Sequence, residues 1–243
     1  MSSEAKVSYQ PSITLTIRHT GNILGNLEDL PRLGTVIKNE RQANPNMLLF
    51  DTGNFSGNNK PGPHKGLPHV EIMNLLKFDA VVPGRAETMH SAELRQMARK
   101  AQFPFLASNW RGMGEGDYFK RSIKIERGGL SVVVLGMAWP EAPQDTGPIP
   151  PEQALKEALS EYDVPNCAVV VLSQLGYTLD RALAVNDKTS KIILSGVSTP
   201  GFEQQTMIGS SLLVPVSPGA SSLGAVDITL SGKVDINKEQ AKS

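Results

Sequence analysis

The sequence predicts an α/β protein with mixed β-sheets. Strand and helix patterns alternate for most of its length, which indicates parallel βα units with functional loops at the carboxyl ends of the strands. Two β runs separated by RGG at residues 127–129 indicate a hairpin. The closing β runs at 211–218 and 223–236 are typical of an antiparallel sheet edge, so we expect mixed rather than purely parallel sheets.

Each element follows from its local pattern. The alternating run ITLTI predicts a strand at 12–19, and Pro31 in a first turn indicates a helix at 31–44. The apolar run NMLLFDTG, ending in a Gly turn, predicts a buried strand at 46–53. Further helices are expected at 69–78, 88–102 and 150–162, and further strands at 79–84, 103–110, 166–176 and 191–196.

The composition indicates a globular protein with a sizeable core. The chain has 243 residues, of which 40% are hydrophobic and 20% charged. Lys+Arg and Asp+Glu balance at 24 each, so no net charge attracts nucleic acid or an anionic membrane. Aromatic residues make up 5%, which argues against a stacking platform for nucleic acid.

The chain shows no apolar run near the ~18 residues of a membrane span, and its first residues show no signal-peptide core. We therefore expect no direct membrane insertion and a cytoplasmic protein, with a processed exported form left open. Residues 1–12 are expected to be an extension, 13–236 one domain and 237–243 a tail. Cys167 lies in an apolar run and is expected to be a buried strand residue.

Five loops that follow the expected strands carry a recognisable order of motifs. They are HTGNILG (19–25), DTGN (51–54), GRAE (84–87), LSQLG (172–176) and SGVST (195–199). In that order they resemble the motifs of the metallophosphatase domain of 5′-nucleotidases and other calcineurin-like phosphoesterases. The resemblance runs from Ile13 to Leu230. It implies a metallo-dependent phosphatase-like fold, a four-layer αββα sandwich of two mixed sheets flanked by helices.

The resemblance also implies a pair of metal ions held by Asp, His and Asn side chains, which polarise a phosphoryl group and activate water. Here the matching positions carry other residues. The degenerate ligand positions are Asn22, Leu24, Asn54, Arg85, Ala86, Gln174, Val197 and Thr199. Three of these keep an amide carbonyl without charge, and Arg85 adds a positive charge. We therefore expect no catalytic residues, no metal and no cofactor.

These substitutions predict a pseudoenzyme that keeps the scaffold as a protein-interaction or structural subunit of a larger complex. The sequence ends shortly after VDITL, so we expect the base-binding domain of full-length 5′-nucleotidases to be absent. Aromatic, Met and branched side chains near the strand ends are candidates for an interaction rim. They are Ile23, Phe55, Trp110, Met113 and Trp139, and packing against the strand ends is the alternative for each.

Two other functions are considered. A module for small anions or phosphoesters would use Arg85 in place of the metal charge, with Asn22 and Asn54 as hydrogen-bond donors. A residual phosphoester hydrolase is the third reading. Ser173 and Ser195 follow strands, but no histidine in a motif is placed to activate either as a nucleophile.

The other polar residues of these loops are expected to be structural. His19 is expected to be buried and hydrogen-bonded, and Asp51 to accept hydrogen bonds from loop N–H groups. Asn109 is expected to be a turn residue at a strand end. A solvated loop is the preferred reading for His64, His69 and Glu71, and a water-facing pair at a helix start for Glu87 and His90.

Overall fold

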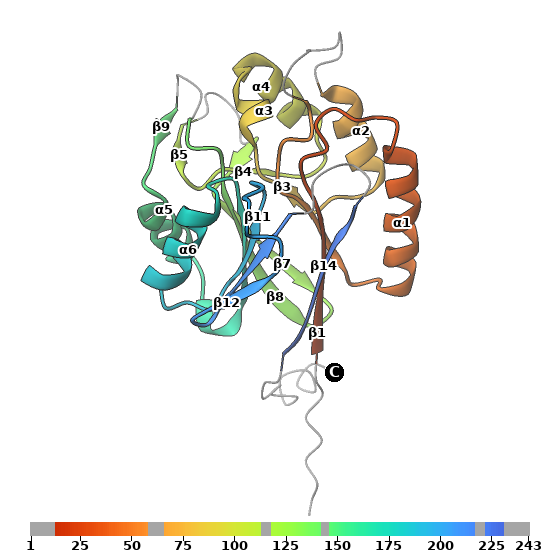
Figure 1. The fold of residues 1–243 in the computed structure, drawn as a ribbon. Coiled ribbons are helices and arrows are strands. Elements are labelled where there is room, and N and C mark those ends of the chain that lie inside the picture. The colour runs from red at the N-terminus through yellow and green to blue at the C-terminus, as the bar shows by residue number, and fades with distance from the viewer. Residues whose placement is uncertain (1–12, 58–65, 113–117, 142–145, 217–221, 231–243) are drawn as a thin grey trace, which may run out of the picture.

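The computed structural model describes residues 13–57, 66–112, 118–141, 146–216 and 222–230. Two six-stranded β-sheets form the centre of the molecule, and helices lie outside each of them (Figure 1). Both sheets contain parallel and antiparallel strand pairs. The mixed αββα sandwich expected from the sequence is confirmed.

The first sheet begins with an antiparallel pair and continues with parallel strands. Its spatial order is β14 (Gly224–Leu230), β1 (Ile13–Thr20), β2 (Leu48–Asp51), β3 (Ala80–Val81), β4 (Phe105–Leu106) and β6 (Phe119–Lys120). Strands β1 and β14 pair antiparallel over seven positions, from Ile13 with Leu230 to His19 with Gly224. Parallel pairing of β1, β2 and β3 brings their carboxyl ends to one edge of the sheet.

The second sheet has antiparallel strands at both edges. Its order is β12 (Thr206–Ile208), β13 (Ser211–Pro215), β11 (Ile192–Ser195), β10 (Ala168–Ser173), β8 (Leu130–Met137) and β7 (Ser122–Arg127). The hairpin predicted at the RGG turn joins β7 and β8. Strand β13 runs parallel to β11 but antiparallel to β12, so the antiparallel pairing predicted for 211–218 is found on one side of this strand. Strand β12, which was not predicted, pairs antiparallel with β13 and forms that edge.

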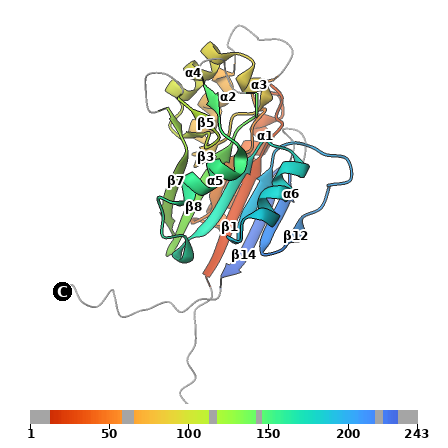
Figure 2. The ribbon, with the colours of Figure 1, turned by 90° about the vertical axis from the view of Figure 1, so that its left-hand side faces the viewer.

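Most helices lie outside the sheets, whereas the short helix that follows the loop after β3 and the helix after it lie beyond the strand ends (Figure 1). The helices are α1 (Leu30–Ala43), α2 (Leu67–Leu75), α3 (Arg85–Thr88), α4 (Ser91–Lys100), α5 (Pro151–Leu159) and α6 (Tyr177–Asn186), with a 3₁₀ turn at Val164–Asn166. A short pair, β5 (Trp110–Arg111) and β9 (Gly147–Pro148), lies apart from both sheets. Helices α5 and α6 lie over the second sheet, while α1 lies on the far side of the sandwich (Figure 2).

The buried hydrophobic residues form two clusters, because the central strands are buried on both faces. In β8, Val132 and Val134 face the large cluster between the sheets, whereas Val133 and Leu135 face the cluster beneath α5 and α6. Gly136 allows β8 to approach the first sheet, since a Cβ there would lie 2.3 Å from the carbonyl oxygen of Leu106. The sandwich thus holds its strand ends in fixed positions.

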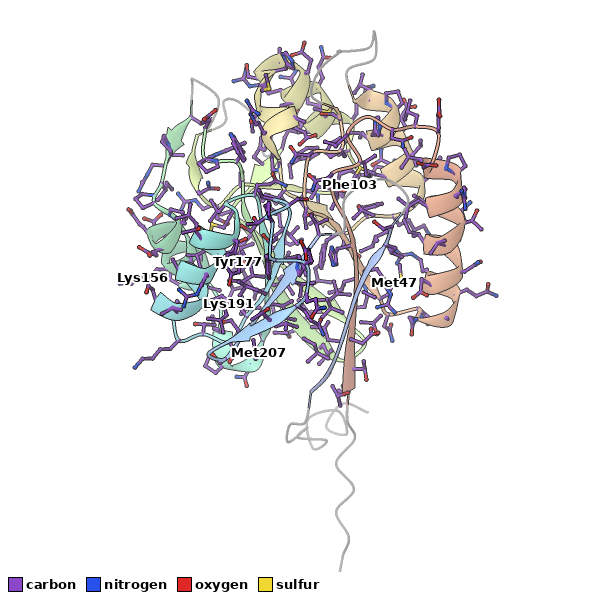
Figure 3. All side chains as sticks on the ribbon, in the orientation of Figure 1. Met47, Phe103, Lys156, Tyr177, Lys191 and Met207 are labelled. Carbon is purple, nitrogen blue, oxygen red and sulfur yellow. The ribbon has the colours of Figure 1, made fainter. Side chains whose placement is uncertain are left out.

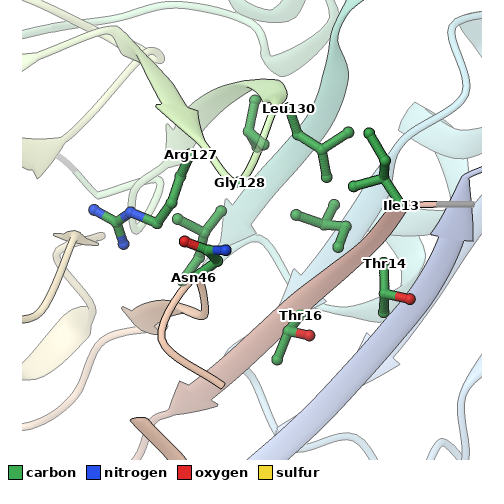
Figure 4. A pocket seen from close by; sticks show the side chains of 10 residues that line it. Ile13, Thr14, Thr16, Asn46, Arg127, Gly128 and Leu130 are labelled. Atoms are coloured by element: carbon green, nitrogen blue, oxygen red, sulfur yellow. The ribbon is translucent and has the colours of Figure 1, made fainter. Parts of the chain in front are cut away.

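A cavity of about 270 Å³ lies where β1 begins, at the end opposite the strand-end loops (Figure 4). Ile13, Thr14 and Leu130 line it, together with Asn46 and Arg127. It shares no residue with the five loop motifs. Among the described residues, no helix is both long and apolar enough to cross a membrane.

Candidate functional site

The five loop motifs meet at the carboxyl ends of the strands. The first two loops are joined by their backbones: Asn22 N donates to Gly53 O at 2.9 Å, and Leu24 N donates to Asn54 O at 2.8 Å. The loop after β10 reaches across from the second sheet, where the side-chain amide of Gln174 donates to the Thr52 carbonyl. The positions singled out in the sequence therefore converge from both sheets.

Three side-chain amides form a connected network at the centre of these loops. Asn54 Nδ2 donates to Asn22 Oδ1 at 3.0 Å and to Gln174 Oε1 at 3.2 Å. Asn54 Oδ1 accepts from the Ala86 backbone N–H at 3.0 Å, and Asn22 Nδ2 donates to Gly196 O at 3.0 Å. All three amide oxygens therefore accept hydrogen bonds from within the protein.

Two buried carboxylates hold the loop after β2. Asp51 accepts from Thr20 Oγ1 at 2.6 Å and from Gly53 N at 2.7 Å, as expected for a structural acceptor. Burial raises the pKa of Asp51 to about 7, although these hydrogen bonds oppose the shift. Glu87 accepts from Asn54 N and Ser56 N, both at 2.9 Å. Glu87 is 1% exposed, so the predicted water-facing position is wrong.

A third buried carboxylate explains the two strand-end serines. Ser173 Oγ donates to Asp180 Oδ1, and Ser195 Oγ donates to Asp180 Oδ2 at 2.5 Å. Asp180 lies in α6, so the contact fastens this helix to the ends of β10 and β11. Burial raises the pKa of Asp180 to about 6 against the opposing effect of both serines. Both hydroxyls are fully buried and donate to the same carboxylate, so neither is exposed as a nucleophile.

We compared the chain with known proteins to find which it is similar to. No protein-family profile matches the chain. It is 25% identical to rat 5′-nucleotidase over 215 residues, which cover 75% of this chain and 37% of that protein. It is 24% identical to the uncharacterized metallophosphoesterase YunD of Bacillus subtilis over 231 residues, covering 89% of this chain and 50% of that protein.

A solved structure agrees with these relatives. The 5′-nucleotidase precursor of Thermus thermophilus superposes with a TM-score of 0.75 at 19% identity, covering 90% of this chain and 52% of that one. The chain is similar to 5′-nucleotidases and to a metallophosphoesterase, and it shares their fold. The predicted resemblance is confirmed, and the chain spans between 37% and 52% of the length of the three proteins compared.

The metal pair implied by the resemblance does not fit the residues of this chain. Its described residues contain no group of three or more His, Cys, Asp or Glu side chains able to hold a metal ion. The oxygens of Asn22, Asn54 and Gln174 are uncharged and already accept hydrogen bonds. A metal ion would need to displace that network without gaining a carboxylate ligand.

The remaining degenerate positions lie around the amide network. Leu24 is 51% exposed and has a backbone φ of 55°, a left-handed conformation that is costly for a branched side chain. Arg85 is exposed at the start of α3, and Ala86 is buried beside Asn54. Val197 and Thr199 are half-buried, and Thr199 Oγ1 donates to the Val197 carbonyl at 3.4 Å.

The donors expected for an anion site are engaged elsewhere. Asn22 Nδ2 faces Gly196 O and Ser198 Oγ, while Asn54 Nδ2 faces two amide oxygens. Arg85 shares the third loop, but neither asparagine directs a free N–H toward a ligand position. Anion binding at these residues stays a prediction, and the geometry adds no donor in its favour.

The predicted interaction rim needs correction. Ile23, Phe55 and Trp110 are buried in the main hydrophobic core, because their loops fold back onto the strand ends. Trp139 is half-buried and its carbonyl accepts from Trp110 Nε1 at 3.3 Å. Met113 lies outside the described residues. The exposed apolar side chains of the same loops are Leu24 and, directly after α3, Met89.

Other polar residues also differ from expectation. His19 is buried as predicted, but its ring nitrogens find no hydrogen-bond partner among the described residues, and the ring packs against Gly224. His69 is buried in α2 near Phe55 rather than in a solvated loop, while His64 lies outside the described residues. Burial lowers the pKa of both His19 and His69 to about 4.

The remaining residues singled out in the sequence are Asn109, Cys167, Glu71 and His90. Asn109 Nδ2 donates to the Ala138 carbonyl at 2.9 Å and Oδ1 accepts from the Ala138 N–H at 2.8 Å, so Asn109 ties two segments together beyond a simple turn role. Cys167 is half-buried and precedes β10, so its predicted burial inside the strand is wrong. Glu71 and His90 are exposed.

Proposed function

We propose that this chain is a catalytically inactive member of its fold that serves as a protein-interaction or structural subunit of a larger complex. The observation that carries the proposal is the amide network of Asn22, Asn54 and Gln174 at the convergence of the strand ends. Neutral amides there bond to one another and to the backbone. They are not arranged around an open position for a metal ion.

The chemistry of phosphoester cleavage supports this interpretation. Metal-assisted hydrolysis needs dications that polarise the phosphoryl oxygens and lower the pKa of a bound water. Carboxylates and imidazoles hold such ions because they supply charge and lone pairs. The three amides supply no charge, and Arg85 places a positive charge on the adjoining loop. The nearby depression that Ser56, Ala86 and His90 help to line has about 20 Å³, roughly the room for one water.

The preserved scaffold supports a retained role other than catalysis. The central strands β8, β10 and β11 are buried, and the loops after β1 and β2 are joined by ordered backbone hydrogen bonds. Leu24 is held in a costly left-handed conformation with its side chain in solvent. An exposed apolar side chain in a strained loop is a feature that contact with a partner explains. A cytoplasmic location stays part of the proposal.

Catalysis is tested with purified protein and a panel of nucleotides and generic phosphoesters, assayed with added Mn²⁺, Mg²⁺ or Zn²⁺. We expect no turnover above a buffer control. Any trace of turnover is compared with that of the Gln174→Ala and Arg85→Ala variants. Turnover that both substitutions leave unchanged belongs to a contaminant, whereas turnover that either one abolishes would overturn the proposal.

The interaction role is tested by affinity capture from native lysate, followed by size determination of the recovered complex. We expect the protein to elute with a stoichiometric partner, and Leu24→Asn to lose it, since Asn adopts the left-handed conformation readily and removes the apolar contact. The matched control is Leu75→Asn on α2, a 78% exposed leucine outside the strand-end loops. Recovery of a free monomer, or equal loss in both variants, would count against this surface.

A further inference from the structure

The amide network joins the two sheets of the sandwich. Asn22 and Asn54 follow β1 and β2 of the first sheet, whereas Gln174 and Gly196 follow β10 and β11 of the second. The hydrogen bonds from Asn54 to Gln174 and from Asn22 to Gly196 both cross between the sheets. Gln174 returns a third cross-sheet bond to the Thr52 carbonyl.

Asn54 is the centre of this network and uses both functions of its amide. Its Nδ2 donates to two side-chain oxygens, and its Oδ1 accepts from the Ala86 N–H. A carboxylate at this position would lose both donors and face the oxygens of Asn22 and Gln174. An apolar residue would leave these buried oxygens with fewer partners. The backbone φ of 60° is one that Asn tolerates better than most residues.

Burial of the network makes the loss of any of its hydrogen bonds costly. Gln174 is fully buried and Asn22 is nearly so, and water has little access to replace a lost partner. The backbones of the two sheets lie close together beside these amides, since a Cβ on Gly196 would lie 2.1 Å from the Thr52 carbonyl oxygen. Buried polar networks whose members are all satisfied stabilise one arrangement, and half-satisfied networks are costly.

We propose that the amides of Asn22, Asn54 and Gln174 act as a metal-independent clasp that fastens the carboxyl ends of the two sheets. The clasp closes the space between the loops with hydrogen bonds alone. The folded state therefore needs no metal ion at this edge. The inference concerns stability, and its test has no activity readout: the unfolding midpoint in EDTA decides it whatever the turnover assay shows.

The test measures the thermal unfolding midpoint of the full chain with EDTA, without additive and with excess Mn²⁺ or Zn²⁺. We expect the wild-type midpoint to be the same in EDTA and buffer. Asn54→Asp is expected to lower the midpoint by roughly 5–10 °C, with no recovery in Mn²⁺. The matched control is Asn39→Asp, an exposed position on α1, which is expected to leave the midpoint unchanged.

A second variant keeps the test decisive if Asn54→Asp does not fold. Gln174→Met preserves the length of the side chain but removes its polar atoms, and we expect a drop of several degrees that metal ions do not alter. The clasp is overturned if EDTA lowers the wild-type midpoint, if Mn²⁺ raises Asn54→Asp above wild type, or if Gln174→Met unfolds at the wild-type temperature.

Discussion

At the scale of single residues, the Glu87 carboxylate accepts four hydrogen bonds from described residues of the strand-end loops. Its Oε2 accepts from the N–H groups of Asn54 at 2.9 Å and Gly84 at 2.8 Å. Its Oε1 accepts from Ser56 N at 2.9 Å and from Ser56 Oγ at 2.7 Å. One buried side chain therefore fixes the loops after β2 and β3 relative to each other.

We predict that Glu87→Gln lowers the free energy of unfolding by about 2–4 kcal/mol, because a buried N–H group would face backbone donors that lose their acceptor. Urea unfolding monitored by circular dichroism measures the change. Glu71→Gln, at an exposed position on α2, is the control and is expected to have little effect. Equal stability of Glu87→Gln and wild type would show that these four hydrogen bonds contribute nothing net.

Glu87 also shows why part of the site could not be predicted. The order of strands and loops predicted that Glu87 lies near the strand ends, since parallel strand ends meet at one edge. The sequence did not predict that Glu87 is buried, because a charged residue at a helix start usually faces water. Ile23 and Phe55 were predicted to form an exposed rim but are buried. The segments that bury a loop side chain are distant in the sequence, so burial could not be read from the loop alone.

At the scale of elements, the junction between α6 and β11 depends on a buried lysine. Lys191 precedes β11 and lies beside the end of α6 (Figure 3). Its side chain is 0% exposed, and its Nζ donates to the carbonyls of Leu183, Asp187 and Thr189 at 3.3, 3.0 and 2.7 Å. A carboxylate oxygen of Asp187 lies 3.0 Å away. The ammonium thus satisfies carbonyls at the helix end.

We predict that Lys191→Met lowers the free energy of unfolding by about 2–4 kcal/mol, since the carbonyls around the ammonium and the Asp187 carboxylate lose a charged partner. Denaturant unfolding measures it. Lys188→Met changes an exposed lysine in the same connection and should stay close to wild type. If both variants unfold at the same denaturant concentration, the buried ammonium is not what secures α6.

Helix α6 was itself missing from the sequence prediction, although most strands and the hairpin were found. Its sequence, YTLDRALAVN, has a weak apolar periodicity, and Gly176 before it offers no side-chain cap. The helix is held instead by tertiary contacts: Asp180 accepts from Ser195 at the end of β11, and Lys191 donates to the Leu183 carbonyl within the helix. The helix expected at 88–102 corresponds to α4, which begins only at Ser91 because the backbone of His90 is not helical, and the short α3 precedes it. The amphipathic patterns of α1, α4 and α5 were sufficient to predict these helices, whereas α6 depends on tertiary contacts.

At the scale of the whole molecule, four buried titratable groups change the pH dependence of folding stability in opposite directions. Burial lowers the pKa of His19 and His69 to about 4, and raises those of Asp51 and Asp180 to about 7 and about 6. Between about pH 4 and about pH 6, each histidine binds a proton only in the unfolded state, so its contribution favours folding as pH rises. Each aspartate binds a proton only in the folded state, so its contribution weakens folding as pH rises.

Two contributions of each sign leave these groups with no net proton uptake or release on unfolding, so we predict a nearly flat dependence of stability on pH between about pH 4.5 and about pH 6. Single substitutions that remove one of these groups should give stability a measurable slope against pH. Asp180→Asn, which resembles the protonated acid, should make stability rise with pH by about 1.4 kcal/mol per pH unit, and His69→Leu should make it fall by a similar amount. Unfolding midpoints across this range measure both slopes. His90→Gln alters an exposed ring and should leave the profile flat, whereas slopes of the same sign in the two buried variants would refute the balance.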